Sequence, residues 1–466
     1  MSTATSPSAT AFAVSRDPAT DAVIAEYPFA DDAQLETLLA QAEQGFQVWR
    51  GTSLSRRADI LRSMASVLRE HRHELALLAT AEMGKTERES LGEVEKCAVL
   101  CEWYAEHGPA WLADEPTLVP DAKAYVAYRP LGVVLAVMPW NFPYWQIMRA
   151  AVPILLGGNG YVVKPAENVV GCALRLHQLW LEAGLPAHVF EAVNLQREHV
   201  ATAIADPRIA AVTVTGSVQA GRSIAALAGK ALKKVLLELG GSDPFIVLAD
   251  ADLEAAAEAA VAGRFQNAGQ VCIASKRLIV ERSVLAPFTA LVLDKVRALK
   301  VGDGRDPEVR MGPMARLDLL EQLHQQVQDS VAAGARLLEG GRRLPREGFF
   351  YAPTVLADVA PGQPAFDGET FGPVAALIEA RDAEHAVELA NHSDYGLSGA
   401  LWTADVERAH ELAVRLVTGA VFINGSSTSD PRVPIGGVKQ SGFGRELSHF
   451  GLREFVNAQT VWLDRR

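Results

Sequence analysis

The stretch Ala210–Gly241, AAVTVTGSVQAGRSIAALAGKALKKVLLELGG, alternates strand-like and helix-like patterns. AAVTVTG and KKVLLELGG are short apolar runs that close on glycine, and SVQAGRSIAALAG between them has the apolar spacing of an amphipathic helix. A strand, a helix and a second strand in this order form a βαβ unit, and such units build parallel sheets. The stretch therefore predicts an α/β fold.

The same alternation continues on both sides of this stretch. On the N-terminal side we expect helices at residues 143–158, 169–184 and 199–206 and strands at residues 161–165 and 190–194, after a helical region at about residues 31–106. On the C-terminal side the alternation restarts at Pro244 with PFIVLADADLE, which indicates a second α/β domain. The terminal run FVNAQTVWLD predicts a lone strand that needs a partner within the chain or across a subunit interface.

The composition excludes several classes of protein. A length of 466 residues predicts about two or three domains, and a net charge of −12 argues against nucleic acid as a partner. The chain has no run of about 18 apolar residues, and its N-terminus lacks the features of a signal peptide. Four cysteines are too few for a disulfide scaffold. We therefore expect a cytoplasmic, reduced protein that does not interact with a membrane.

Three of the four cysteines fit a structural role. Cys97 and Cys101 share one helical face and no other ligands accompany them, so we interpret them as core residues and expect no metal site. Cys172 follows helical apolar spacing and has the same interpretation. Cys272 lies in the segment GQVCIAS, and it is either a packing thiol or a nucleophile that needs a base or a positive potential nearby.

Polar residues follow the predicted strands at their carboxyl ends, where parallel sheets bind their ligands. Gly216 and Ser217, with Gly221 in the next turn, open a helix whose free N–H groups suit a pyrophosphate, although a serine N-cap explains the same pattern. Lys164 and Glu167 are either ligands of ribose hydroxyls or ordinary loop charges. The usual G-x-G-x-x-G dinucleotide fingerprint is absent.

Two further polar residues have both a chemical and a structural interpretation. Glu238 ends an apolar strand, where burial raises the pKa of a carboxyl and favours a general base, but a carboxylate that caps a neighbouring helix fits equally well. Asn141 lies in the stiff loop VMPWNFPYW, where its amide is either an oxyanion donor or a turn asparagine.

Together and in this order, these segments resemble the aldehyde dehydrogenase superfamily. The resemblance rests on Asn141, Lys164 with Glu167, the Gly216–Ser217 turn, Glu238 in LELGG, Cys272 in GQVC and Glu369 in ETFGPV. It runs from about Asp17 to the C-terminus and so covers nearly the whole chain. It implies two α/β domains, a Rossmann-like NAD-binding domain and a catalytic domain, with a small β oligomerisation arm.

The resemblance implies a role for each of these residues. Cys272 would attack the aldehyde carbonyl, with the oxyanion held by Asn141 and by the backbone N–H of the cysteine. Hydride would pass to the nicotinamide and leave a thioester, which water activated by Glu238 would hydrolyse. The implied cofactor ligands are Trp140, Lys164, Glu167, Gly216, Ser217, Gly221, Glu369 and Phe371. A glutamate at position 167 would accept two ribose hydroxyls and repel a 2′-phosphate, so we predict NAD as the preferred cofactor and NADP as the alternative.

Within the family, the stretches AAVTVTGSVQAG, GRFQNAGQVC and GGVKQSGFGRELSHFG are most similar to bacterial succinate-semialdehyde dehydrogenases. Arg149 matches an arginine that holds the remote carboxylate of the substrate, and Gln266 stands where some members have a second arginine. The compensating donors that we expect are Ser426, Ser429 and Arg432.

The resemblance leaves three alternatives. The same fold acts on other aldehydes, such as glutarate semialdehyde or aliphatic and aromatic aldehydes. Related proteins reduce acyl phosphates or pass the acyl group to coenzyme A, and a non-catalytic nucleotide-binding protein is the third alternative. The presence of Cys272, Glu238 and Asn141 together speaks against the third, and Glu238 favours release by hydrolysis.

The family architecture predicts how the chain is divided. We expect the NAD-binding domain at residues 1–121 and 139–241, the catalytic domain at 242–434 and the oligomerisation arm at 122–138 and 435–466. The arm implies a homodimer or a homotetramer.

Overall fold

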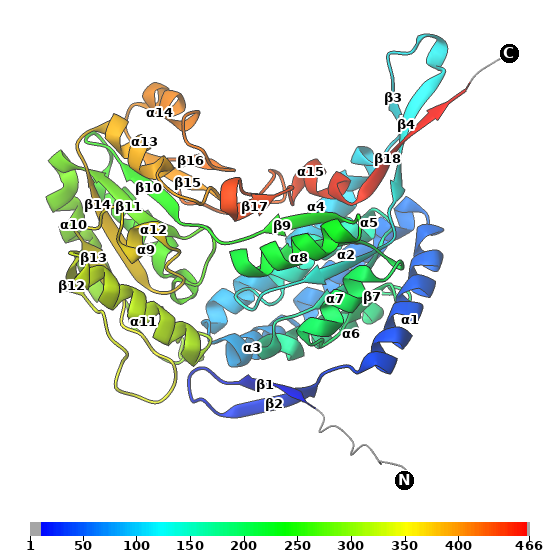
Figure 1. Cartoon of the computed structure of the whole chain (residues 1–466), viewed down its shortest axis with the longest axis horizontal. Helices are drawn as coiled ribbons and strands as arrows, with labels where there is room; N and C mark the ends of the chain where they lie inside the picture. Colours follow the sequence, from blue (N-terminus) through cyan, green and yellow to red (C-terminus); the bar gives the residue numbers. More distant parts are fainter. Residues whose placement is uncertain (1–10, 464–466) are drawn as a thin grey trace.

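The computed structural model describes residues 11–463, and one of its two large sheets has six strands in the order β17-β9-β8-β5-β6-β7 (Figure 1). All pairs in it are parallel except β17 with β9. Its strands are β5 (Val133–Val137), β6 (Gly160–Lys164), β7 (Phe190–Ala192), β8 (Ile209–Thr215), β9 (Lys234–Glu238) and β17 (Gly442–Phe443). The predicted βαβ unit is present as β8, α8 (Val218–Lys230) and β9.

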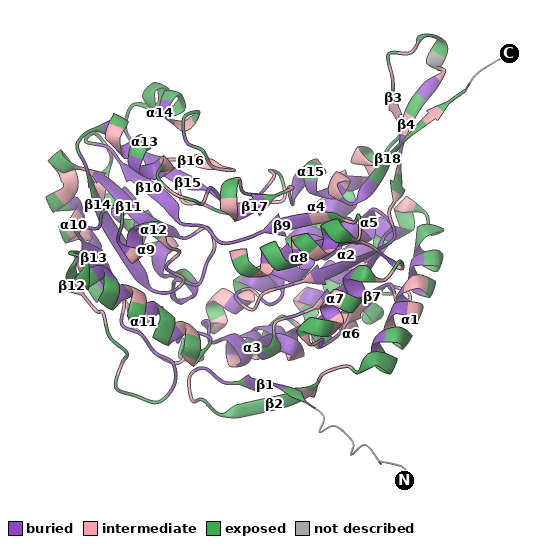
Figure 2. Cartoon of the chain, in the orientation of Figure 1, coloured by how far each residue is buried: buried purple, intermediate pink, exposed green. Residues whose placement is uncertain are grey.

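Helices cover both faces of this sheet. Alternate residues of β5 point to opposite faces: Val134 and Ala136 belong to the core of α2, α4 and α5, whereas Val133 and Leu135 pack with α1, α7 and α8. The helices around the sheet, besides α8, are α1 (Asp32–Arg50), α2 (Leu54–Glu70), α3 (Arg72–Met83), α4 (Glu87–Trp111), α5 (Trp145–Leu156), α6 (Val170–Glu182) and α7 (Arg197–Ala205). The central strands β5, β6 and β8 are buried over most of their length (Figure 2), which explains why they read as continuous apolar runs.

The second large sheet has seven strands in the order β12-β13-β14-β11-β10-β15-β16. Its strands are β10 (Asp243–Val247), β11 (Ser275–Glu281), β12 (Arg336–Glu339), β13 (Thr354–Ala357), β14 (Val374–Ala380), β15 (Gly399–Trp402) and β16 (Val421–Ile423). Its helices are α9 (Leu253–Phe265), α10 (Arg282–Arg297), α11 (Leu317–Ala332), α12 (Pro364–Asp367), α13 (Ala383–Asn391) and α14 (Val406–Ala413). Leu278 packs with α9 and α10, and Ile279 packs with α11 and α13 on the other face. The second α/β domain is therefore confirmed.

The two large sheets are joined by a very short connection. β9 ends at Glu238 and β10 begins at Asp243, so the chain passes from one sheet to the other within residues 239–242 (Figure 1). The carboxyl end of β9 therefore lies at the boundary of the two α/β units.

A three-stranded sheet projects from the rest of the chain (Figure 1). It pairs β4 (Ala124–Pro130) with β3 (Glu115–Pro116) and with the terminal strand β18 (Val456–Trp462), both antiparallel. The predicted terminal strand thus has its partner within the chain. The remaining elements are the hairpin β1 (Phe12–Arg16) and β2 (Val23–Pro28) and the helix α15 (Ser448–Glu454).

Two boundaries predicted for the arm are wrong. β5 is a central strand of the six-stranded sheet, paired with β6 and β8, so it does not belong to an arm at residues 122–138. β17 pairs with β9 in the same sheet, so an arm at residues 435–466 begins too early. The run AKAYVAYRPLGVVLAV has one β-branched, strand-like character throughout, which hid the change of sheet at the Pro130–Gly132 turn.

The helices within residues 11–463 are too short or too polar to cross a membrane. Over the same range, no three histidine, cysteine, aspartate or glutamate side chains are grouped as metal ligands. Cys97, Cys101 and Cys172 are buried among apolar residues.

Candidate active site

Cys272 follows a loop with an unusual backbone between α9 and β11. Asn267, Ala268 and Gly269 have φ angles of 53°, 52° and 72°, in the left-handed region that residues other than glycine rarely adopt. Gly269 also packs so closely on Gly372 that a Cβ atom would collide with the carbonyl oxygen. Such a backbone costs energy and persists only where surrounding contacts hold it. The glycine of the GQVC segment is therefore a steric requirement of the loop.

Two buried cations hold this loop in place. Arg264 donates hydrogen bonds to the carbonyl oxygens of Gly269 (3.2 Å) and Thr370 (2.8 Å), and so joins the loop to the segment after α12. Lys276 donates to the carbonyl oxygen of Cys272 (2.6 Å). Because both side chains are buried, water does not compete for these hydrogen bonds.

Cys272 is half-buried and lines two cavities. The smaller cavity, of about 210 Å³, includes Trp140, Asn141, Gly216, Ser217, Glu369 and Phe371. The larger cavity, of about 370 Å³, includes Arg88, Lys96, Arg149, Gln266 and Ser429. The smaller cavity has one carboxylate, Glu369, and no cationic side chain in its wall, whereas the larger has three cationic side chains and two carboxylates, Glu89 and Glu93. One thiol therefore faces two spaces of different charge.

The Cys272 thiol is protonated at neutral pH in this arrangement. Burial raises the pKa of the thiol to about 11, and the positive charges of Arg149 and Lys276 offset only part of this effect. A thiolate nucleophile therefore forms only when a base removes the proton or a bound ligand changes the local potential.

Asn141 lies in the wall of the smaller cavity beside Cys272 and is buried. The side-chain amide of Asn141 donates to the backbone carbonyl oxygen of Gln270 (3.0 Å). The backbone carbonyl oxygen of Asn141 accepts from the side-chain amide of Asn267 (2.8 Å). An amide nitrogen has two hydrogens, so one remains free to donate. Within residues 11–463 the backbone N–H of Cys272 donates no hydrogen bond. These two donors have the chemistry of an oxyanion site.

Glu238 is buried at the carboxyl end of β9. Burial raises the pKa of its carboxyl to about 8, and the positive charge of Arg149 opposes the rise. Oε1 has no hydrogen-bond partner among the described residues. Glu238 does not line either cavity, but its negative charge contributes to the raised pKa of the Cys272 thiol. A carboxyl with this pKa can accept a proton near neutral pH.

Arg149 lines the larger cavity from α5 and is completely enclosed by other residues. It forms a buried ion pair with Glu446, a residue just before α15. Its guanidinium also donates to Oγ1 of Thr215 (3.4 Å) at the end of β8. The guanidinium that was predicted to bind a substrate carboxylate therefore already has a carboxylate partner.

Of the other predicted substrate donors, only Ser429 lines the larger cavity. Ser426 turns toward α9, where its hydroxyl donates to the carbonyl oxygen of Ala259 (3.4 Å). Arg432 is exposed and forms a bidentate ion pair with Asp430, with N–O distances of 2.7 and 2.6 Å. Of the three donors offered by this loop, Ser426 and Arg432 are therefore engaged elsewhere in this structure.

Several predicted cofactor residues meet in the smaller cavity. The rings of Trp140 and Phe371 pack edge to face with their centroids 5.7 Å apart. Glu369 accepts from the backbone N–H of Gly241 (3.1 Å) and forms an ion pair with Lys276 (3.2 Å). Ser217 caps α8. The space thus joins a helix N-terminus, an aromatic wall and a fixed carboxylate.

Lys164, Glu167 and Gly221 lie outside this cavity. Lys164 ends β6, and burial lowers its pKa while the charge of Glu167 opposes the change. Both side chains line a separate cavity of about 900 Å³ between the β1–β2 hairpin and α11. Gly221 packs against Leu239, where a Cβ atom would collide with the leucine side chain. Gly221 therefore permits close packing of α8 on the sheet.

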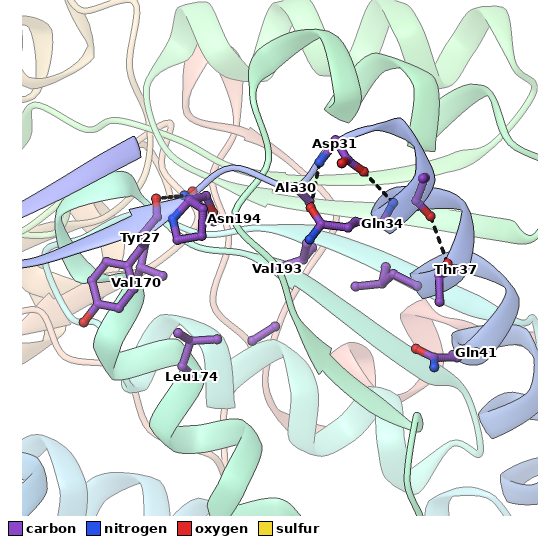
Figure 3. A pocket seen from close by; sticks show the side chains of 14 residues that line it. Tyr27, Ala30, Asp31, Gln34, Thr37, Gln41, Val170, Leu174, Val193 and Asn194 are labelled. Carbon is purple, nitrogen blue, oxygen red and sulfur yellow. Dashed lines mark hydrogen bonds between the residues drawn. The ribbon is translucent and has the colours of Figure 1, made fainter. Parts of the chain in front are cut away.

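A further cavity, of about 560 Å³, lies between α1, α6 and the end of β7 (Figure 3). Its polar groups mainly bond to one another: Asp31 and Gln34 form the capping box of α1, and Thr37 donates to Ala33 (2.9 Å). Asn194 donates to the carbonyl oxygen of Tyr27 (3.1 Å). Neither a thiol nor a cationic side chain lines it, so the cavities at Cys272 are the candidate active site.

The sequence matches the family described as "Aldehyde dehydrogenase family" over residues 5–461. The chain belongs to the aldehyde dehydrogenase family. This aldehyde dehydrogenase is 55% identical to "Succinate semialdehyde dehydrogenase [NAD(P)+] Sad" of Escherichia coli (strain K12), over 97% of this chain and 98% of that protein. It is 44% identical to "Probable succinate-semialdehyde dehydrogenase [NADP(+)]" of Synechocystis sp., over 96% and 98% of the two chains.

Among solved structures, a succinic semialdehyde dehydrogenase from Streptococcus pyogenes in complex with NADP+ superposes on this aldehyde dehydrogenase with a TM-score of 0.95. The two share 37% identity, and the alignment covers 98% of this chain and 100% of that one. The predicted family, its α/β fold and the prediction of an aldehyde dehydrogenase are therefore confirmed.

Four residues that shape the aldehyde dehydrogenase site were not predicted. They are Lys96, Arg264, Lys276 and Glu446. Arg264 and Lys276 stand eight residues before and four residues after Cys272, so their proximity in sequence was a usable signal. Glu446 and Lys96 come from distant segments, and no local pattern connects them with the cysteine.

Proposed function

We propose that this aldehyde dehydrogenase oxidises succinate semialdehyde to succinate with a nicotinamide dinucleotide. The observation that carries the proposal is Cys272 in the wall of a cavity where cationic side chains outnumber carboxylates. The three cations are Arg88, Lys96 and Arg149, and the two carboxylates are Glu89 and Glu93. An aldehyde with a carboxylate at its far end would place its carbonyl at the thiol and its charge among these cations. Relatives at 55% and 44% identity are named for the same substrate, which supports the choice.

Cys272 forms the covalent intermediate in this proposal. Once deprotonated, its sulfur adds to the aldehyde carbon, and the carbonyl oxygen becomes an oxyanion. The free hydrogen of the Asn141 amide and the backbone N–H of Cys272 donate to that oxygen. A donor of this kind stabilises the charge by about 3 kcal/mol in comparable sites. The chemistry that a nicotinamide supplies when bound is acceptance of the hydride, so that the adduct on the cysteine becomes a thioester.

Glu238 acts in the release of the acid. Its carboxylate takes a proton from water while the water oxygen attacks the thioester carbon. The bond between sulfur and carbon then breaks, succinate leaves, and the thiolate is restored on Cys272. A pKa of about 8 suits this role, because the carboxyl gains and loses a proton near neutral pH.

The residues of the smaller cavity fit the nicotinamide end of a dinucleotide. Gly216 has open space where a side chain would stand, and Ser217 caps only the N–H of Ala220 (3.2 Å), so other N–H groups at the start of α8 are available to a phosphate. Glu369, fixed by Gly241 and Lys276, can accept ribose hydroxyls. Lys164 and Glu167 would bind the hydroxyls of the adenosine ribose.

We infer that NAD is preferred over NADP. Glu167, at the carboxyl end of β6, can accept both hydroxyls of the adenosine ribose, and its charge would repel a 2′-phosphate. Several relatives are named for NADP(+), and the ratio of kcat/KM with NAD to that with NADP tests the preference of this enzyme directly.

The test is production of reduced cofactor over a panel of aldehydes, with the Cys272→Ala variant as the blank. The panel contains succinate semialdehyde, glutarate semialdehyde, butanal and benzaldehyde. We expect kcat/KM for succinate semialdehyde to exceed that for butanal, its uncharged four-carbon counterpart, by about tenfold or more. Butanal at an equal or higher kcat/KM would reject an acidic substrate, and a higher value for glutarate semialdehyde would assign the longer acid.

We also infer that the projecting sheet is the oligomerisation arm and that the six-stranded and seven-stranded sheets are the cofactor-binding and catalytic domains. Within residues 11–463 one edge of β18 has no strand partner, and Trp462 and Leu463 are exposed there (59% and 54%), as expected for a surface that a second copy covers. Light scattering should give a dimer or a tetramer, and a monomer at micromolar concentration would contradict the arm.

A further inference from the structure

We propose that Lys96 binds the remote carboxylate of the substrate and thereby selects acidic aldehydes over neutral ones. The proposal rests on the proposed function, because it assigns the anion-binding group of the same cavity. Lys96 is on α4, far in sequence from the predicted site residues, and lines the larger cavity together with Cys272 and Ser429. Three observations distinguish it from the other cations of that cavity.

The first observation is that the contacts of the Lys96 ammonium are uncharged. Its Nζ donates to the hydroxyl of Ser429 (2.6 Å) and lies 4.2 Å from the centroid of the Trp145 ring. Burial and the positive charge of Arg149 lower the pKa of Lys96 to about 8, which agrees with a cation that lacks full compensation. An anion that enters the cavity would supply the negative charge that no side chain of the protein places next to this ammonium.

The second observation is that the acidic side chains near Lys96 are bound by other groups. Glu89 and Glu93 line the same cavity. Glu89 accepts from the backbone N–H of Asn267 (2.7 Å) and from the hydroxyl of Thr86 (2.8 Å), and Glu93 forms a buried ion pair with Lys85. Asp430 forms its ion pair with Arg432 (2.6 Å). None of these carboxylates forms an ion pair with Lys96, and no other acidic group does so within residues 11–463. Lys96 therefore faces the cavity without a dedicated counter-ion.

The third observation is the contrast with Arg149. The buried pair of Arg149 and Glu446 is close to neutral as a unit, and the charge of Glu238 also acts on Arg149. If Arg149 turned to a substrate, it would leave the Glu446 carboxylate buried without a partner, which is costly. Arg88, the remaining cation of the cavity, is exposed, so water and salt screen its charge. Of the three cations, Lys96 is thus the one that is shielded from solvent and has no carboxylate partner.

Ser429 completes the proposed anion site. Its hydroxyl accepts from Lys96 and retains a hydrogen of its own, so it can donate to a carboxylate oxygen next to the ammonium. Trp145 fixes the ammonium from another side. A carboxylate would thus meet an ammonium and a hydroxyl that neighbouring side chains already position.

The test compares Lys96→Met with the wild-type enzyme on succinate semialdehyde and butanal. Methionine keeps the length of the side chain and favours helix, and the change removes a buried cation, so α4 should fold normally. We expect kcat/KM for succinate semialdehyde to fall by about 10- to 100-fold, mainly through KM, and kcat/KM for butanal to change by less than about threefold. Lys96→Arg should keep most of the preference for the acidic aldehyde.

Lys230→Met is the matched control, since it removes the same charge at the exposed C-terminal end of α8 and should leave both substrates unchanged. A Lys96→Met enzyme that keeps the wild-type ratio of kcat/KM values, or loses both activities equally, overturns the assignment of Lys96 alone. A wild-type enzyme without preference for succinate semialdehyde overturns the proposed function and this assignment with it. An Arg149→Met enzyme that abolishes the preference while Lys96→Met keeps it would transfer the role to Arg149.

Discussion

The two cavities that meet at Cys272 differ in charge and in the way their side chains are held. The smaller cavity contains one carboxylate, Glu369, that a backbone N–H and Lys276 fix. The larger contains three cationic side chains and two carboxylates, Glu89 and Glu93, so cations are in excess there although the chain as a whole has a net charge of −12. A local positive potential inside an acidic protein is a specific feature of one site, since the global field opposes it.

This difference separates two tasks of one enzyme. Cys272 and Asn141 act on the carbonyl group that every aldehyde shares, whereas the larger cavity contacts the part of the substrate that differs between aldehydes. Changes at the shared thiol should therefore affect all substrates alike. Changes in one cavity should alter either the choice of aldehyde or the choice of cofactor, but not both.

The largest expected effect is that of Cys272→Ala, which removes the group that both cavities share. We expect oxidation of every aldehyde to fall by about 10⁴-fold or more, since no other thiol reaches either cavity. Production of reduced cofactor measures the loss. The matched control is Cys97→Ala, a buried thiol outside both cavities, which should stay active. Activity in Cys272→Ala above about a hundredth of the wild-type rate would reject a covalent mechanism on this residue.

Glu238→Gln should have the next largest effect, on release of the acid. We expect steady-state turnover to fall by about 10³-fold, because the side-chain amide of the substituted glutamine cannot take a proton from water. A rapid burst of reduced cofactor should precede the slow phase, with an amplitude of one molecule of reduced cofactor per active site. Hydroxylamine attacks a thioester without a general base, so it should restore turnover in the variant. A variant with neither a burst nor rescue would show that Glu238 does not act in hydrolysis.

The pH dependence of the wild-type enzyme follows from the same carboxyl. Only the ionised form of Glu238 accepts a proton, and its pKa is about 8. The rate of the hydrolytic step should therefore rise with pH up to about 8 and level off above it. Single-turnover decay of the acyl enzyme measures this step, and Glu238→Gln should lack the rising limb.

The sequence predicts most of the fold because the strands and helices have strong local patterns. The run of Ala210–Gly241 became β8, α8 and β9 within one to three residues of the expected bounds. The error at residues 122–138 arose where two strands of different sheets follow one another with only a short turn between them. Local pattern identifies a strand, but its sheet depends on partners elsewhere in the chain.

The site was predictable only where residue type and neighbours in sequence are informative. Cys272, Asn141 and Glu238 lie in or beside segments that contain glycine or proline, and these segments have a recognisable order. Lys96 and Glu446 are ordinary charged residues in helical or loop sequence, and their meaning comes from what lies beside them in space. Charge pairing across distant segments has no local signature, so it had to come from the structure.

Asn141→Ala should have a smaller effect. This variant tests the oxyanion donor that lines the smaller cavity and that every aldehyde would use. Loss of one oxyanion donor should lower kcat/KM by about 10²-fold, and equally for succinate semialdehyde and butanal, because both form the same oxyanion. The ratio between the two substrates is the measurement that matters. A change in that ratio would mean that Asn141 also contacts the rest of the substrate, and the division of tasks between the cavities would fail.

Glu167→Ser should have the smallest effect, and it concerns only the cofactor. The carboxylate of Glu167 lies outside both cavities of Cys272, so the variant should keep its preference between succinate semialdehyde and butanal. Removal of the negative charge should shift the ratio of kcat/KM with NAD to that with NADP by about tenfold toward NADP.

Both cofactors must be compared on the same aldehyde, since the argument concerns one ribose. Lys164, next to Glu167 in the same cavity, supplies a positive charge that a 2′-phosphate can use once the carboxylate is gone. The gain with NADP should therefore exceed the loss with NAD. A wild-type enzyme that already uses NADP as well as NAD would contradict the role given to Glu167, and a variant that loses both cofactors equally would show that the carboxylate binds a group common to the two.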